Sequence, residues 1–512
     1  MTCVRALEAI GAASFADIGV DAAGGGSANP ADGLRDSHPA ARGRLALVPG
    51  SRFARPGNGA GDAQNGFLCA ALSAIETRLV PRGPPRPISS PGRQTMARTD
   101  TIVLGAGVVG TALALHLAKR GLSVALIDRR GPGEETSYGN SGVLGGAGVY
   151  PTAFPRRLST LLKVALKQAP EANYHMAHLP LVARWLFAYY RNSTPERLGE
   201  IARTMRPLMR RVVAEHEALL QEAGAERYLR KTGWISLFRT DRKFEALKRE
   251  LELCAELGVN VRPLDVAGTQ FLEPSLQPVF RRAVHWPDTA SLSNPLAVTQ
   301  AYAARFAALG GITLKGDARS LHRSEGRWRV DTAEGPVDAE TVVVTLGPWA
   351  PDVLEPLGVR LPLAMKRGYH RHYRPQGNAG LTRPVVDVEV GYVLAPMEQG
   401  IRLTTGAEFA ARDAAPTPVQ FDRLMPKAKA LFPLGEPVEP EPWLGRRPCF
   451  PDMMPVVGRA PGPLGNAGLW LNYGHGHLGL SLSAVTGRLV AEMITGATPF
   501  TDPALFGPQR FG

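Results

Sequence analysis

Cysteine is scarce in this chain of 512 residues, and the four cysteines lie far apart. They are Cys3, Cys69, Cys254 and Cys449. They form no Cys-x-x-Cys pair and have no closely spaced histidines beside them, so the sequence predicts neither a disulfide framework nor a metal site. Such cysteine use fits a reducing compartment, and we therefore expect a cytoplasmic protein.

Long apolar runs, and basic runs interleaved with aromatic residues, are also missing. No stretch approaches the roughly 18 apolar residues that a membrane-spanning helix requires. The formal net charge is +13, but the basic residues are dispersed, and residues 1–95 contain no lysine. The sequence therefore predicts no nucleic-acid partner. A basic surface can still attract anionic lipids, so a peripheral contact at the inner face of the membrane stays open.

Residues 1–95 differ in composition from the rest of the chain. They are rich in Gly, Pro, Ala, Ser and Arg, with runs at 24–26 and 81–87. Such a composition cannot bury enough apolar surface to offset the entropy lost on ordering. Met96 lies just before the first apolar strand. We expect 1–95 to be either a disordered extension or the result of a wrongly assigned start codon.

A glycine turn between an apolar strand and a helical stretch is the strongest positive signal. Its pattern is Gly-x-Gly-x-x-Gly, formed by Gly105, Gly107 and Gly110. The first glycine permits the tight turn, the second lets the backbone approach a pyrophosphate, and the third lets the helix pack on the strand. The N-terminus of the helix then faces the phosphates with free N–H groups and a partial positive charge.

The strand that follows this helix ends in an acidic residue. Apolar residues 123–127 lead to Asp128, whose carboxylate can accept hydrogen bonds from the hydroxyls of a ribose. Because strand, turn, helix, strand and acid come in this order, the sequence predicts a dinucleotide-binding unit. The residues predicted to contact the dinucleotide here are Gly105, Gly107, Val108, Val109, Gly110, Asp128 and Arg129.

The remaining chain shows helical and strand patterns without an internal repeat. Apolar residues at helical spacing predict helices over 158–167, 179–190, 195–223, 241–257, 295–309 and 478–495. Short apolar runs predict strands at 234–238, 260–263, 312–315, 328–332, 341–345 and 469–472. The run at 341–345 is typical of a buried parallel strand, and the alternation over 361–412 is typical of an antiparallel sheet.

Four blocks of sequence occur in an order that points to one family. They are the glycine turn with its acid; 135–142; 347–350 followed by 366–369; and 443–448 followed by 451–458 and 472–479. Together they resemble the flavoprotein family of D-amino-acid oxidases and dehydrogenases, which includes glycine oxidase and sarcosine oxidase. The resemblance covers about 98–507 and is strongest to the small-subunit type of bacterial D-amino-acid dehydrogenase.

The resemblance implies an α/β fold with two interleaved domains. One is an FAD-binding Rossmann-like domain of the glutathione-reductase type, expected to comprise 96–160, 284–360 and 440–512. The other is an α+β substrate-binding domain built on an antiparallel sheet, expected to comprise 161–283 and 361–439.

The resemblance also implies further residues that hold FAD. They are Ser137, Asn140, Ser141, Gly142, Gly347, Trp349, Gly474, Gly476, His477, Leu478 and Gly479. Residues 474–479 open onto the last helix, whose N-terminus would stabilise negative charge on the reduced flavin. His475 and His477 could act as bases or could fill space beside the flavin, and the second interpretation is favoured.

Arg447 matches the family's arginine that binds the substrate carboxylate, which a planar guanidinium can hold with two parallel bonds. Arg446 is a rival, because adjacent residues of a strand point to opposite faces. Tyr369 and His370 follow a glycine on a strand expected to border the substrate, and Tyr392 is a second tyrosine candidate. A buried core tyrosine is the alternative for each of the two tyrosines.

Two departures from the family pattern matter. Arg446 stands where the family usually has leucine. Leu444 stands at the position of the flavin-linking cysteine of sarcosine oxidases, and Cys449 lies only two residues before Pro451. We therefore expect FAD to be bound noncovalently.

The sequence thus predicts an FAD-dependent enzyme that oxidises a small-molecule amino acid. The expected substrate is a D-amino acid, or a cyclic imino acid such as D-proline or hydroxy-D-proline, which gives a hydride from its α-carbon to flavin N5. The alternatives are an oxidase of N-methyl amino acids of the sarcosine type and an electron-transfer subunit of a larger complex. Neither the electron acceptor, quinone or oxygen, nor the oligomeric state follows from the sequence.

Overall fold

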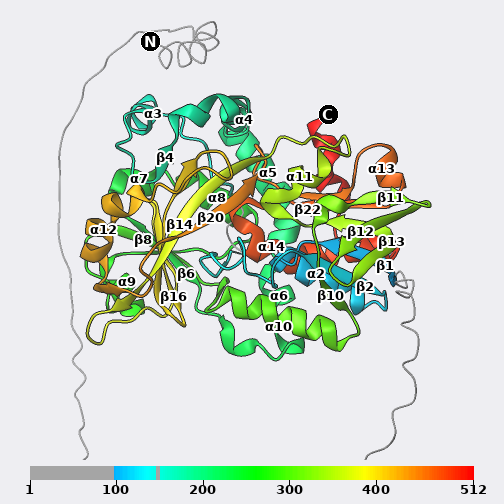
Figure 1. Cartoon of the computed structure of the whole chain (residues 1–512). Helices are drawn as coiled ribbons and strands as arrows, with labels where there is room; N and C mark the ends of the chain where they lie inside the picture. Colours follow the sequence, from blue (N-terminus) through cyan, green and yellow to red (C-terminus); the bar gives the residue numbers. More distant parts are fainter. Residues whose placement is uncertain (1–96, 146–149) are drawn as a thin grey trace, which may run out of the picture. The chain divides into compact units, whose positions relative to one another are not determined.

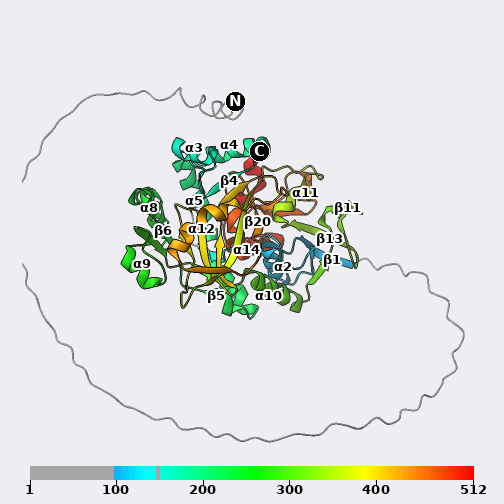
Figure 2. The same cartoon turned by 60° about the vertical axis from the view of Figure 1, so that its left-hand side comes forward.

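The computed structural model describes residues 97–145 and 150–512, so the prediction for 1–95 lies outside the described residues. These residues form an eight-stranded sheet, an eleven-stranded sheet and a three-stranded sheet. Figures 1 and 2 show the two large sheets, with helices packed against them.

The eight-stranded sheet contains the predicted dinucleotide-binding unit. Its strand order is β10-β2-β1-β13-β12-β11; β22 pairs with β13, and β21 pairs with β22. The pairs from β10 through β2, β1 and β13 to β22 are parallel, as the apolar run at 341–345 predicts. The strands are β1 (Ala97–Leu104), β2 (Val124–Asp128), β10 (Ile312–Lys315), β11 (His322–Ser324), β12 (Arg327–Thr332), β13 (Gly335–Val344), β21 (Val456–Arg459) and β22 (Leu469–Tyr473).

The eleven-stranded sheet is mostly antiparallel. Its order is β4-β18-β14-β17-β16-β15-β6-β8-β7, with β19 and β20 also paired with β14. The pairs β15/β6 and β18/β4 are parallel. The strands are β4 (Ala172–Tyr174), β6 (Trp234–Phe238), β7 (Arg262–Leu264), β8 (Arg282–Trp286), β14 (Ala364–Pro375), β15 (Val385–Asp387), β16 (Tyr392–Met397), β17 (Gly400–Thr404), β18 (Ala407–Phe409), β19 (Leu434–Pro437) and β20 (Trp443–Cys449).

The small sheet and the helices complete the described fold. The small sheet has the order β3-β9-β5, with β3 (Val143–Leu144), β5 (Leu229–Arg230) and β9 (Ala290–Leu292). The helices are α2 (Val108–Ala118), α3 (Leu158–Ala165), α4 (Leu179–Arg191), α5 (Pro195–Met209), α6 (Val212–Glu222), α7 (Asp241–Glu245), α8 (Lys248–Glu256), α9 (Val266–Leu272), α10 (Pro295–Ala308), α11 (Ala350–Leu354), α12 (Val419–Leu431), α13 (Pro463–Asn466) and α14 (Gly479–Ile494).

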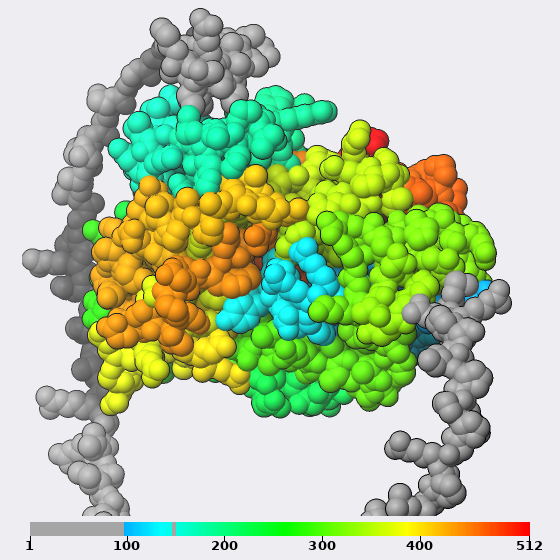
Figure 3. Space-filling model, viewed as in Figure 1, coloured from blue at the N-terminus to red at the C-terminus, as the bar shows by residue number. Residues whose placement is uncertain are grey.

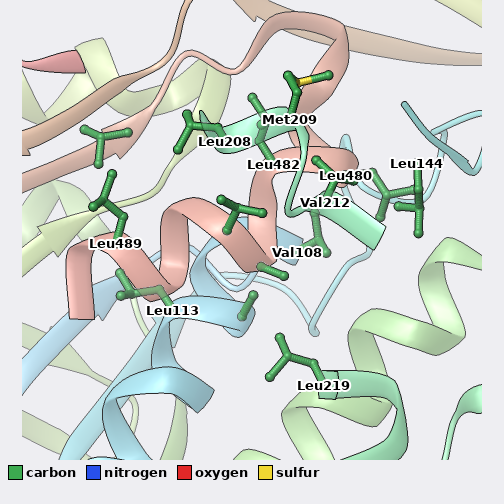
Figure 4. Close-up of a cluster of buried hydrophobic side chains, with 14 of the residues drawn as sticks. Val108, Leu113, Leu144, Leu208, Met209, Val212, Leu219, Leu480, Leu482 and Leu489 are labelled. Atoms are coloured by element: carbon green, nitrogen blue, oxygen red, sulfur yellow. The ribbon is translucent and has the colours of Figure 1, made fainter. Parts of the chain in front are cut away.

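Helices α2 and α14 cross closely because a small residue lies at their contact. A Cβ on Gly487 of α14 would stand 3.0 Å from the backbone nitrogen of Leu113 in α2. Figure 4 shows the apolar cluster around this contact, to which α5 and α6 add Met209 and Val212. This buried cluster holds the helix that follows the glycine turn against its sheet.

Two stretches predicted as single helices are each broken into two. The stretch 195–223 divides into α5 and α6, because the chain turns at Arg210 and Arg211 while the flanking Met209 and Val212 are both buried. The stretch 241–257 divides into α7 and α8 around Leu247, which packs against the same large core cluster. Helical spacing alone reveals neither break.

The sheets are interleaved along the chain, and the exact domain boundaries remain a prediction. Strand β20 pairs with β14 in the eleven-stranded sheet, although the predicted boundary placed 440–512 with the FAD-binding domain. Strand β8 likewise pairs with β6, although 284–360 was expected in that domain.

Candidate active site

A cavity of about 900 Å³ lies at the carboxyl ends of the parallel strands. It is bordered by the loops that follow β1, β2, β13 and β22, and on the other side by β14, β20 and helix α3. Ligands of α/β proteins commonly bind at this edge of a parallel sheet. Figure 3 shows one face of the molecule, on which the segment after β2 lies between parts of the chain that come much later in the sequence.

The glycine turn has the geometry that its sequence predicts. Gly105 has a φ of +105°, which residues with a side chain rarely adopt. A Cβ on Gly110 would stand 1.9 Å from the carbonyl oxygen of Gly105, so only glycine lets α2 start this close to the strand. At Gly107 the nearest atom to such a Cβ is Ser137 Oγ, at 3.3 Å, and the backbone borders the cavity. Val108 and Val109 border the cavity as well, whereas Gly110 does not.

Asp128 supports the turn and also borders the cavity. Its Oδ2 accepts a hydrogen bond from the Ala106 N–H at 2.7 Å, and its Oδ1 accepts one from the Arg130 N–H at 2.9 Å. An ionised carboxylate can accept about four hydrogen bonds, so capacity remains for a ribose. The next residue, Arg129, stacks its guanidinium 4.8 Å over the ring of Trp349, which joins the loops after β2 and β13.

The loop around Ser137 and Asn140 is held by side-chain bonds to the backbone. Ser137 Oγ accepts a hydrogen bond from the Val108 N–H at 2.9 Å, and Asn140 Oδ1 accepts one from the Gly142 N–H at 2.8 Å. Buried Arg402 donates to the carbonyl of Asn140. Ser137, Asn140 and Ser141 border the cavity, but Gly142 does not. A Cβ on Gly142 would lie 2.2 Å from the Leu292 carbonyl oxygen. Close packing against Leu292 therefore explains why this residue is glycine, without a contact to the cofactor.

The loop after β22 brings backbone and two histidines to the cavity. Gly347 from the loop after β13 also borders it, as do the predicted residues Gly474, Gly476, His477, Leu478 and Gly479. Burial lowers the pKa of His475 to about 3, and its Nε2 lies 3.1 Å from Thr486 Oγ1. His477 is exposed along the cavity wall, where partial removal from bulk water and the nearby cations Lys366 and Arg447 lower its pKa to about 4. Both imidazoles are therefore neutral at physiological pH.

Asn472, near the end of β22, borders the cavity. The sequence motif 472–479 includes this residue, but no role was predicted for it. Its side chain is fully buried, and neither its amide nitrogen nor its amide oxygen has a hydrogen-bond partner within the described chain. A buried amide without partners is costly unless a ligand supplies them. Together with the glycine turn and Asp128, this unpaired amide fits a bound dinucleotide with a polar ring system such as FAD.

The two neighbouring arginines of β20 differ in their surroundings, although both border the cavity. Arg447 lies over Gly368, where an added Cβ would stand 2.5 Å from its guanidinium. It donates to the carbonyls of Gly406 at 3.0 Å and Thr405 at 3.3 Å, and it forms no ion pair with an acid within the described residues. Arg446 points to the other face, donates to the Arg412 carbonyl at 2.9 Å and lies 3.8 Å from an oxygen of Asp413.

The tyrosine and histidine predicted on β14 lie on opposite faces of that strand. Tyr369 borders the cavity, but its hydroxyl donates to Glu408 Oε1 at 3.0 Å and accepts from the Thr417 N–H at 2.6 Å, inside the core. The ring of His370 packs against Trp443 at 5.0 Å between centroids and does not border the cavity. Burial lowers the pKa of His370 to about 2. The positions of these two side chains give no support to substrate contact.

Tyr392 on β16 does border the cavity. Its hydroxyl is buried, and burial together with the nearby Asp387 carboxylate raises its pKa. Of the four residues predicted to act on the substrate, Arg447, Tyr369 and Tyr392 border the cavity and His370 does not. The Tyr369 hydroxyl is bonded to Glu408, and the Tyr392 hydroxyl lies beside Asp387 and Arg239, so Arg447 is the strongest of the three candidates. Lys366, which no prediction included, also borders the cavity. Alternate residues of a strand share a face, so the sequence could have placed Lys366 on the same face of the strand as Gly368.

Comparisons with known proteins agree with this cavity. The family of FAD dependent oxidoreductases called DAO matches residues 100–493. A D-amino acid dehydrogenase of Paramagnetospirillum magneticum is 33% identical over 424 residues, covering 80% of this chain and 98% of that protein. A second D-amino acid dehydrogenase, from Chromohalobacter salexigens, is 30% identical and covers 80% of this chain and 99% of its own length.

Solved structures share the fold at lower identity. Glycine oxidase from Geobacillus kaustophilus has a TM-score of 0.62 at 23% identity, covering 81% of this chain and 99% of that one. L-proline dehydrogenase from P. horikoshii has a TM-score of 0.61 at 19% identity, covering 81% of this chain and 98% of that one.

Fold and cavity define an α/β enzyme that uses FAD for oxidation and reduction. The chain belongs to the DAO family of FAD-dependent oxidoreductases. The predicted family, fold class and cofactor are thereby confirmed.

Proposed function

We propose that this chain oxidises a D-amino acid at its α-carbon. The observation that carries the proposal is Arg447, a guanidinium inside the cavity that forms no ion pair with an acid of the described chain. A cation placed beside a flavin site without an internal partner is suited to bind the carboxylate of a substrate. The names of the relatives support the D-amino acid as the substrate class.

Each group at the cavity would have a separate role in the oxidation. FAD, when bound, supplies the acceptor for the hydride. Arg447 would hold the α-carboxylate and so orient the α-carbon, while its bonds to the carbonyls of Thr405 and Gly406 fix the guanidinium. His475 and His477 would remain neutral, because burial lowers the pKa of His475 to about 3, and desolvation together with Lys366 and Arg447 lowers that of His477 to about 4. An amine that binds without its extra proton would then need no base from these histidines.

The test is anaerobic reduction of the purified flavoprotein by a panel of compounds. We expect D-amino acids to bleach the flavin absorbance, and L-enantiomers to do so at least about tenfold more slowly. Bleaching by sarcosine alone would instead support an N-methyl amino acid oxidase, and bleaching by D-proline or hydroxy-D-proline alone would support a cyclic imino acid enzyme. No bleaching by any member would support an electron-transfer subunit.

Noncovalent FAD is a separate prediction with a simple measurement. Leu444 stands at the position of the sarcosine-type cysteine, and Cys449 is the cysteine of the described chain that borders the cavity. Burial raises the pKa of the Cys449 thiol, which keeps it protonated and unreactive. Acid precipitation should therefore release the yellow chromophore into the supernatant. Flavin that stays in the pellet of wild type would contradict the prediction, and its release from Cys449→Ser would identify Cys449 as the point of attachment.

Helices α3 and α4 support the expectation of a peripheral membrane contact. Leu158 and Leu162 on α3, and Leu166 directly after it, repeat every four residues and are 69%, 50% and 65% exposed. The segment 156–191 carries six Lys or Arg residues and one acid, Glu171. Exposed leucines beside basic residues suit the interface of an anionic bilayer. No helix within 97–145 and 150–512 is long and apolar enough to cross a bilayer.

We propose that this face rests on the membrane, where a quinone could serve as electron acceptor. Thr160, Leu161 and Val164, on the other side of α3, border the cavity, so the same helix would link the lipid surface to the site. Leu162→Asp combined with Leu166→Asp should weaken cosedimentation with anionic vesicles by about tenfold or more. Leu505→Asp, at another leucine that is 43% exposed, serves as control. Equal binding by all three proteins would overturn the assignment of this face.

A further inference from the structure

Lys366 is a buried cation in an unusual setting. It lies on β14, is 8% exposed and borders the cavity. Its Nζ lies 3.9 Å from the ring centre of Tyr189 and 3.6 Å from Met453 Sδ, with the ring of Trp185 at 5.7 Å. These neighbours are π faces and a thioether, which attract an ammonium group only weakly compared with a carboxylate.

No acid of the described chain forms an ion pair with Lys366. The contrast with the next residue is direct, because buried Arg367 lies 3.0 Å from the carboxylate of Glu408. Among the acids that border the cavity, Asp387 is paired with Arg239 at 2.8 Å and Asp352 with Arg412 at 2.7 Å. Glu171 and Glu250 border the cavity too, but neither lies within ion-pair distance of Lys366. A buried charge without a partner is destabilising, so its presence at a ligand cavity suggests that a ligand completes it.

The strand register places Lys366 beside Arg447. The two residues are direct partners in the antiparallel pair β14/β20, so their side chains leave the sheet on the same face. Their ends then diverge: the guanidinium of Arg447 lies over Gly368, and the ammonium of Lys366 lies against Tyr189 and Met453. The cavity therefore carries two cations a short distance apart, both without an acidic partner in the described chain.

The electrostatics agree with this geometry. Burial and the nearby Arg447 lower the pKa of Lys366 to about 8, so the ammonium is still largely charged at neutral pH. Lys366, Arg447 and His477 all border the cavity, and both cations also lower the pKa of His477. A second anion in this space would relieve the repulsion between the two cations as well as pair with the lysine.

We propose that Lys366 binds a second anionic group of the substrate, so that this enzyme prefers amino acids with an acidic side chain over neutral ones. The α-carboxylate would bind Arg447 and the side-chain carboxylate would bind Lys366. This inference rests on the proposed function, since it assigns the substrate class of the same site. D-Aspartate and D-glutamate are the simplest compounds of that class.

The test compares wild type with Lys366→Met, whose apolar side chain suits the surroundings of Trp185, Tyr189 and Met453. Wild type should reduce its flavin with D-aspartate or D-glutamate at a kcat/KM at least about tenfold above that for D-alanine and D-leucine. The ratio of acidic to neutral kcat/KM should fall by about 30-fold or more in Lys366→Met. Lys366→Arg should recover part of the ratio, and Lys429→Met, an exposed lysine of α12, should not change it.

A binding measurement keeps the test independent of turnover. Glutarate and butyrate are titrated into the oxidised holoenzyme, and binding is followed by the change in flavin absorbance. Glutarate should bind wild type at least about tenfold more tightly than butyrate, and Lys366→Met should abolish this difference.

The outcomes separate this inference from the proposed function. Oxidation of neutral D-amino acids with a ratio unchanged in Lys366→Met would overturn the inference and leave the proposed function standing. Equal losses with acidic and neutral substrates, or an altered flavin spectrum without ligand, would show that Lys366 acts on the cofactor and would also overturn it. If no D-amino acid reduces the flavin, the proposed function fails, and the glutarate titration still decides whether Lys366 binds an anion.

Discussion

Arg447→Ala is expected to lower kcat/KM for the proposed amino-acid substrate by about 30-fold or more. The reason is that the substrate carboxylate would lose a bidentate partner while still being removed from water, which costs about 2–5 kcal/mol. The carbonyls of Thr405 and Gly406, which now accept bonds from the guanidinium, would add further repulsion toward a carboxylate. Steady-state kinetics with the best substrate of the panel measures the effect, and the flavin spectrum should stay unchanged.

Two further variants make this prediction specific. Arg447→Lys should recover only part of the activity, because a point charge does not hold the plane of a carboxylate. Arg446→Ala is the matched control, since Arg446 is engaged with the Arg412 carbonyl and Asp413. A larger loss in the Arg446 variant would show that the carboxylate binds the other face of β20. No loss in either variant would show that neither arginine binds the substrate carboxylate.

Arg367→Met is expected to destabilise the protein by about 3–5 kcal/mol. The side chains of Arg367 and Glu408 are both fully buried and lie 3.0 Å apart, so removing the cation leaves an uncompensated carboxylate in the core. Arg367 also donates to the carbonyls of Ala414 at 2.7 Å and Ala415 at 2.9 Å, which would lose these bonds. The midpoint of urea unfolding of the FAD-bound protein, with the slope of the transition, measures the change.

An exposed ion pair provides the control for this prediction. Arg327 lies 2.9 Å from Glu340, but the two side chains are 34% and 73% exposed. Arg327→Met should therefore change the free energy of unfolding by less than about 1 kcal/mol. Equal stability of the two variants would show that the buried pair contributes no more than a surface pair, against our interpretation of the core around β14 and β18.

Features that depend on a few neighbouring residues were predictable from the sequence. The glycine turn is an example, because both the positive φ of Gly105 and the close packing at Gly110 are imposed by residues of the same short segment. The apolar strand at 341–345 and the final helix follow from periodicity in the same way. The family resemblance then predicted the cofactor, because its motifs include the loops at the carboxyl ends of the parallel strands, where FAD would bind.

Features that depend on how distant strands align were decided by the tertiary structure alone. The choice between Arg446 and Arg447 could not be made before the register of β14 and β20 was known. The register of β14 with β18 places Glu408 opposite Arg367, within reach of the Tyr369 hydroxyl. The register of β14 with β20 places Trp443 opposite His370 and covers its ring.

The sequence by itself determined the class of this protein, its cofactor and the order of its main elements, because short-range backbone and packing preferences encode them. Only the tertiary structure placed Lys366 opposite Arg447 and left Asn472 without a partner at the cavity. The physical reason is that the groups around a buried charge or amide decide whether it is already paired or free to bind a ligand. Those neighbours come from segments far apart in the chain, which packing of the core brings together.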